Sequence, residues 1–126
     1  MQRPPPKPTD AELAILQALW RKGPSTVKEV QEQMEEGTGY TTVLKFLQIM
    51  AEKGLVRRDE SQRAHVYEAA VSESATQEQL VTALLKKAFG GSTSKLVMQA
   101  LASKKASADE LAEIRRLIAK LSKEER

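Results

Sequence analysis

Apolar residues recur at spacings of three and four along most of the chain, which predicts amphipathic helices. The pattern predicts helices over residues 10–22, 27–34, 40–53, 74–89, 92–102 and 107–121. Between residues 55 and 69 the spacing changes to two, which predicts two short strands joined by a polar tip at 59–63. We therefore expect a mainly α protein with a small β-hairpin.

Several predicted helices begin with a hydroxyl side chain that is followed three residues later by glutamate, the capping-box pattern. This pattern occurs at Thr9–Glu12, Thr26–Glu29 and Ser107–Glu110. We expect Ser74 to cap the fourth helix, and Thr41 or Thr42 to cap the third. Gly54 and Gly90 follow predicted helices, where glycine commonly ends them.

The order of elements predicts an N-terminal winged helix-turn-helix domain over residues 9–71, because three helices are followed by a hairpin. Residues 1–8 contain four prolines and two cations, and we expect a disordered arm there. Residues 72–126 are expected to form a three-helix C-terminal dimerisation segment. Three short helices bury little surface alone, so a second copy of the chain is the simplest partner for their apolar faces. The alternative is that they fold back onto the winged domain.

The helix over residues 40–53 has the pattern of a recognition helix. Its apolar face is expected to hold Val43, Phe46, Leu47, Ile49 and Met50. The opposite stripe holds Thr41, Lys45, Gln48 and Glu52. A hydroxyl, a cation and an amide can reach phosphates or base edges, whereas the alternative is an ordinary helix with a solvated face. The neighbouring helix and hairpin favour DNA recognition.

The predicted hairpin carries cations that could donate hydrogen bonds to a nucleic-acid backbone. These are Arg57, Arg58 and Arg63, whereas His65 is expected to be a neutral strand residue. The alternative is that they only protect the exposed edge of the hairpin. Because the hairpin follows the recognition helix directly, we expect phosphate contacts from this wing.

Charge and composition limit the classes of function. The formal net charge is +3, but residues 1–70 hold ten Lys/Arg and ten Asp/Glu, so DNA binding would depend on the local placement of charge. The absence of cysteine excludes disulfides and thiolate metal sites, and a single histidine excludes a multi-histidine zinc site. We expect no cofactor and no enzymatic activity, since no phosphate loop or nucleophile–base pair is found. Without a membrane span or a secretory signal, a cytoplasmic location is expected.

The sequence resembles the penicillinase repressor family, a group of winged-helix repressors that includes methicillin-resistance and copper-responsive members. The start of the family pattern is matched at Thr9–Glu12, Leu19–Trp20, Gly23–Pro24 and Val27–Val30. Its recognition helix and exit are matched at Tyr40–Val43, Leu47 and Lys53–Val56. Its wing and dimerisation segment are matched at Arg63–Tyr67, Phe89–Ser92 and Leu96–Val97. The order and spacing of these segments carry the resemblance from Thr9 to about Lys120.

The resemblance implies a homodimer that binds a palindromic operator in double-stranded DNA and represses transcription. The 41–53 helix would enter the major groove, and the 57–65 wing would lie along the backbone. The DNA contacts implied are Thr41, Thr42, Lys45, Gln48, Arg58 and Arg63. The dimer interface implied is Leu80, Leu84, Leu85, Phe89, Leu96, Val97 and Leu101. A sensor protease or another inducing partner would release the repressor.

Two departures from the family concern the inducing signal. Antibiotic-responsive members are cleaved at an Asn-Phe bond, where this chain has Gln99-Ala100. Copper-responsive members carry a cysteine-rich tail, and this chain has no cysteine. Neither antibiotics nor copper is therefore expected as the signal. The alternative function is a winged-helix protein–protein interaction module that does not bind DNA.

Overall fold

The computed structural model describes residues 6–103 and 105–125, and it confirms a mainly helical chain with a small antiparallel sheet. Contacts divide the chain into two compact units, one up to Thr82 and one from Ala83 onward. The division falls within α4 (Glu73–Ala88). The domain boundary predicted at residues 71–72 stays a prediction.

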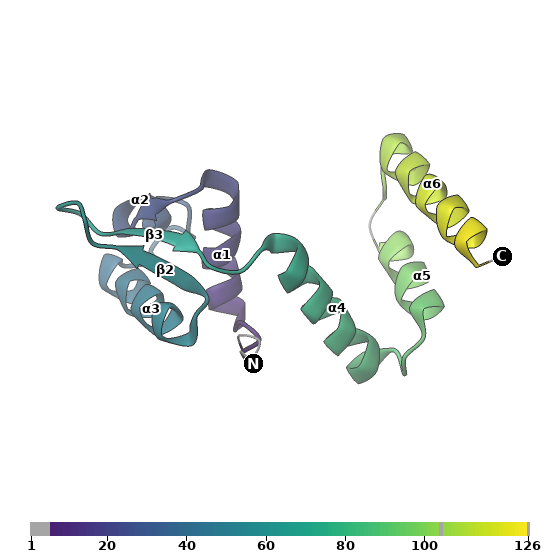
Figure 1. The fold of residues 1–126 in the computed structure, drawn as a ribbon, viewed down its shortest axis with the longest axis horizontal. Coiled ribbons are helices and arrows are strands. Elements are labelled where there is room, and N and C mark those ends of the chain that lie inside the picture. Colours follow the sequence, from purple (N-terminus) through teal and green to yellow (C-terminus); the bar gives the residue numbers. More distant parts are fainter. Residues whose placement is uncertain (1–5, 104, 126) are drawn as a thin grey trace. The chain divides into compact units, whose positions relative to one another are not determined.

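The first unit has the elements of a winged helix (Figure 1). In chain order these are α1 (Asp10–Lys22), β1 (Ser25–Thr26), α2 (Val27–Glu32), α3 (Tyr40–Lys53), β2 (Val56–Asp59) and β3 (Val66–Ala69). The predicted hairpin is formed by β2 and β3, which pair with Arg58 opposite Tyr67. Strand β1 joins β3 on its other edge, with Ser25 opposite Tyr67. The sequence did not predict β1, because a two-residue strand has no periodicity of its own.

The three predicted capping boxes are confirmed at Thr9, Thr26 and Ser107. The predicted caps of the third and fourth helices were wrong. Helix α3 starts after Gly39, which makes no side-chain cap, so Thr41 and Thr42 lie inside the helix. Helix α4 is capped by Ser72 instead of Ser74, since the Ser72 hydroxyl accepts from the Ala75 amide at 3.1 Å.

Helix α2 ends at Glu32, two residues before the predicted end. The Gln33 amide donates to the Val30 carbonyl, three residues back, which tightens the chain into a turn. The Gln31 side chain then donates to the Thr38 carbonyl at 3.0 Å and holds the turn that leads to α3. The helix-turn-helix is thus closed by a side-chain hydrogen bond across its own turn.

One hydrophobic core joins the helices of the first unit to its sheet. Its buried members are Ile15, Leu16, Leu19, Val27, Val30, Val43, Leu47, Met50, Leu55, Val56 and Tyr67. Full burial of such a side chain stabilises the fold by about 1.5–3 kcal/mol. Trp20 packs against the edge of this core, and its indole N–H donates to the Val71 carbonyl at 3.0 Å. The core therefore holds α3 in place by one side and leaves the opposite side of the helix exposed to solvent.

A buried ion pair joins the start of α1 to the end of α3. Glu12 is the capping-box glutamate of α1, and its side chain is only 2% exposed. Its second carboxylate oxygen accepts from Lys53 Nζ at 2.8 Å. The capping-box Glu29 of α2 is bound in the same way by Lys22, also at 2.8 Å, but its side chain is 41% exposed. The two pairs share their chemistry and differ in burial.

The hydrogen bonds lower the pKa of both carboxyl groups. Burial alone would raise the pKa of Glu12, but donation from Lys53 and from the Thr9 amide holds it below its usual value. Donation from Lys22 and from the Thr26 amide lowers the pKa of Glu29 to about 2. A carboxyl whose pKa falls on folding stabilises the folded state above its unfolded pKa. Both charged carboxylates therefore favour folding at neutral pH.

The second unit consists of helices with large apolar exposure. It holds the end of α4, α5 (Thr93–Ser103) and α6 (Ala108–Glu124). Helix α5 starts one residue later than predicted, because Ser92 lies outside it and accepts from the Lys95 amide. None of the described residues from Ala83 onward is buried. Large apolar side chains that stay exposed include Leu84, Val97, Met98, Leu101, Leu117, Ile118 and Leu121.

We predict that Lys53→Met destabilises the protein much more than Lys22→Met. The first change leaves the buried Glu12 carboxylate without its cation, which should lower the free energy of unfolding by about 1–3 kcal/mol, since Lys53 itself is partly solvated. The second change breaks an exposed pair of the same length, which contributes little. Urea denaturation of both variants would measure this. Equal destabilisation would contradict a special role for the buried pair.

Candidate nucleic-acid interface

The polar stripe predicted on α3 is exposed in the structure. Thr41, Lys45, Gln48 and Glu52 all lie on the solvent side. Thr42 is exposed as well, but it follows Thr41 by one residue and lies about 100° further round the helix. On the opposite side Val43, Leu47 and Met50 are buried. The helical period thus separates the side that packs from the side that can contact a partner.

The wing presents its arginines on two faces. Arg57 is paired with Glu68 at 3.1 Å, and its neighbour Arg58 lies opposite Tyr67 in the strand register. Successive residues of a strand point to opposite faces, so these two arginines are on different sides of the hairpin. Arg58 also forms an ion pair with Glu60 at the tip. Arg58 is therefore a partly neutralised cation.

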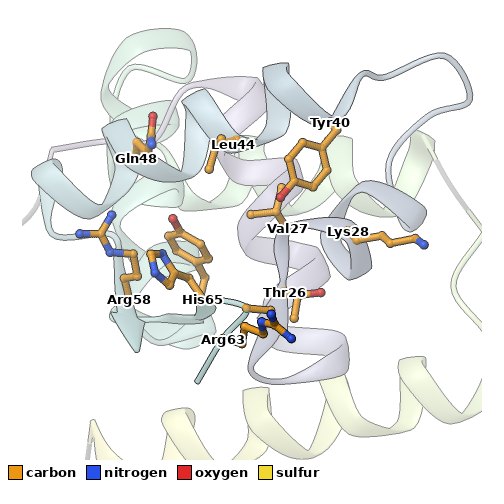
Figure 2. Close-up of a pocket in the computed structure, with 11 residues that line it drawn as sticks. Thr26, Val27, Lys28, Tyr40, Leu44, Gln48, Arg58, Arg63 and His65 are labelled. Carbon is orange, nitrogen blue, oxygen red and sulfur yellow. The ribbon is translucent and has the colours of Figure 1, made fainter. Parts of the chain in front are cut away.

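A groove of about 530 Å³ lies between α3, the wing and the start of α2 (Figure 2). It is lined by Thr26, Val27, Lys28, Tyr40, Leu44, Gln48, Arg58, Arg63, Ala64, His65 and Tyr67. Figure 2 shows Tyr40, Leu44 and Gln48 along one edge, with the wing residues along the opposite edge. None of these described lining residues is acidic. The groove has an apolar interior and a rim of cations and hydrogen-bond donors.

The structure brings only some of the predicted contact residues to this groove. Gln48, Arg58 and Arg63 line it. Thr41, Thr42 and Lys45 do not, and they form a separate exposed surface further round α3. The candidate interface therefore has two parts, the outer side of α3 and the groove beside it.

Sequence reasoning missed two residues of the groove, Lys28 and Tyr40. Tyr40 could have been found, because Tyr40, Leu44 and Gln48 recur at a spacing of four and share one side of α3. Lys28 belongs to α2 and reaches the groove only because α2 packs against α3. No pattern in the sequence around Lys28 indicates this position.

Carboxylates border the groove at its two sides without lining it. A neighbouring hollow is formed by Gln48, Ala51, Glu52, Arg58 and Glu60. Another hollow contains Lys28 together with Glu32, Glu35 and Glu36, the exposed acidic patch of the helix-turn-helix. Positive charge is thus concentrated in the groove, between two acidic regions.

Two other kinds of feature are absent from the described residues. Within 6–103 and 105–125, no group of three His, Cys, Asp or Glu side chains is placed to hold a metal ion. In the same residues, no helix has the length and hydrophobicity needed to cross a membrane. The arginine-rich groove and the α3 stripe are the features that need a functional explanation.

Curated relatives match part of the chain. It is 41% identical over 61 residues to "Transcriptional regulator BlaI" of Mycobacterium tuberculosis, in strains CDC 1551 / Oshkosh and ATCC 25618 / H37Rv. The match covers 46% of this chain and 44% of that protein. The chain therefore matches less than half the length of these relatives.

Solved structures share the fold. One is the solution structure of the DNA-binding domain of the repressor BlaI, with a TM-score of 0.50 and 23% identity, covering 58% of this chain and 92% of that one. Another is a MarR family protein from Bacillus stearothermophilus, with a TM-score of 0.50 and 21% identity, covering 93% of this chain and 74% of that one. At such identities the likeness concerns the fold alone.

The family model of the penicillinase repressor matches residues 8–120, which is most of the chain and includes both compact units. This match confirms the resemblance drawn from the capping boxes, the recognition helix and the wing. The chain belongs to the penicillinase repressor family.

Proposed function

We propose that this protein is a transcriptional repressor that binds double-stranded DNA sequence-specifically. The observation that carries the proposal is the exposed Thr41–Lys45–Gln48 side of α3, which a winged-helix core holds in place. Membership of the penicillinase repressor family supports it, and so do relatives described as transcriptional regulators.

In this proposal α3 enters the major groove, whose width of about 12 Å accommodates a helix about 10–12 Å in diameter. Lys45 donates to guanine or phosphate, and Gln48 is able to pair with adenine. Thr41 and Thr42 contact phosphate or a thymine methyl group. Arg58 and Arg63 of the wing contact the backbone.

We further propose that two copies assemble through the apolar face of the C-terminal helices and bind a palindromic operator. Leu80, Leu85, Phe89 and Leu96 are half-buried, and Leu84, Val97 and Leu101 are exposed in the single chain. Exposed apolar side chains in such number favour a protein interface. A two-fold dimer would place two α3 helices on two half-sites, which explains a palindrome.

The first experiment measures binding of the full chain to duplex DNA from its own upstream region, with a scrambled duplex as control. We expect tighter binding to the native duplex and a steep loss of affinity between 50 and 200 mM salt, roughly in proportion to the phosphates contacted. Fluorescence anisotropy at two salt concentrations would measure both effects. Absence of binding to either duplex at low salt would overturn the proposal in favour of a protein-interaction module.

Lys45→Ala should weaken binding to the native duplex by about 1–3 kcal/mol, the range for one good base contact. Lys45 is exposed, so the fold should be unaffected. Anisotropy titrations of native and scrambled duplex would show a smaller preference for the native one. Lys120→Ala, which removes an exposed lysine from α6, is the control and should bind like the parent protein. Unchanged preference in Lys45→Ala would remove Lys45 from base recognition.

Leu84→Asp should convert the dimer into a monomer, because it would bury a charge in an apolar interface. Sedimentation velocity at several concentrations would show the change in mass. Lys86→Asp is the matched control, since it reverses a charge on the same helix about 200° away from Leu84. A Leu84→Asp variant that remains dimeric would place the interface elsewhere.

A further inference from the structure

We propose that the groove between α2, α3 and the wing holds the sugar–phosphate backbone of the bound DNA, with Lys28 and Tyr40 as additional contact residues. This site would set the strength of binding for any sequence, whereas the outer side of α3 would set the preference among sequences. The proposal rests on the proposed function and assigns a separate role to a second surface.

The charge of the groove supports a polyanion as its ligand. Lys28, Arg58 and Arg63 reach it from α2 and the wing, and none of the described lining residues is acidic. Within the described part of the chain, no ion pair joins Lys28 or Arg63 to a carboxylate, in contrast to Arg57 and Arg58. Unpaired cations from separate elements that converge on one groove are the donors that phosphates attract.

The interior of the groove fits a sugar–phosphate chain better than it fits isolated phosphate ions. Leu44 lines the groove as a half-buried apolar side chain, and the buried Val27 and Tyr67 lie beneath it. Deoxyribose presents carbon atoms between successive phosphates, so a groove lined by both apolar and cationic residues suits it. Tyr40 is 50% exposed, and Figure 2 shows its ring reaching from the start of α3 toward the groove. Its hydroxyl can donate to a phosphate oxygen.

The neighbouring carboxylates define where the backbone lies. Glu52 and Glu60 flank the groove beyond Gln48 and Arg58, toward the end of α3. Glu32, Glu35 and Glu36 flank it on the other side, beyond Lys28, so repulsion from both sides favours a phosphate chain that stays within the groove. Arg58 is already paired with Glu60 and would contribute less than Arg63.

The test compares the salt dependence of DNA binding among single variants of the full chain. Lys28→Ala should weaken binding to native and scrambled duplexes by the same factor, and it should reduce the slope of log K against log salt by about 1. Tyr40→Phe removes only a neutral hydroxyl, so affinity for both duplexes should fall by about 2- to 10-fold with the slope unchanged. Lys45→Ala would instead reduce the preference for the native duplex.

Lys120→Ala is the control, because it removes an exposed lysine of α6 that does not line the groove. It should leave both the affinity and the salt slope unchanged, and circular dichroism would verify folding of every variant. If the parent protein binds DNA but Lys28→Ala keeps the full slope, or if Tyr40→Phe binds like the parent, the groove does not hold the backbone. If the parent binds neither duplex, the proposed function itself fails.

Discussion

The position of α3 depends on one carboxylate that makes two interactions, one with each of its oxygens. Glu12 caps α1 through the Thr9 amide and binds Lys53, the last residue of α3, so one buried side chain connects the start of the first helix to the end of the third. A buried carboxylate is tolerated only when its oxygens are bonded, and both are. The interaction is therefore directional as well as stabilising, unlike the hydrophobic contacts around it.

A fixed α3 is a requirement for any surface that includes its outer side. Val43, Leu47 and Met50 hold one side of the helix in the core, while Lys53 restrains its end. The start of α3 has no side-chain cap, and the Gln31 bond to the Thr38 carbonyl restrains the preceding turn instead. Groups on the outer side can then be presented to a partner without first being ordered, which lowers the entropic cost of binding.

The features that the sequence predicted correctly are those that depend on neighbours along the chain. Capping boxes span three residues, and the exposed stripe of α3 follows from the helical period alone. The missed features depend on partners that are distant in the sequence. Strand β1 forms because Ser25 pairs with Tyr67, and the buried Glu12 is bound by Lys53, which lies 41 residues further along the chain. The groove was missed for the same reason, since no local pattern shows that Lys28 approaches the wing.

The positions of the unpaired charges explain how a neutral half can present a locally positive groove. Four of its carboxylates are paired with cations, in Lys22–Glu29, Lys53–Glu12, Arg57–Glu68 and Arg58–Glu60. In the described residues up to 70, the cations without a carboxylate partner include Lys28, Lys45 and Arg63, which lie on α3 or beside it. Unpaired carboxylates such as Glu35 and Glu36 lie in the turn before α3. Net charge is therefore a poor guide here, because the field near α3 depends on which charges remain unpaired.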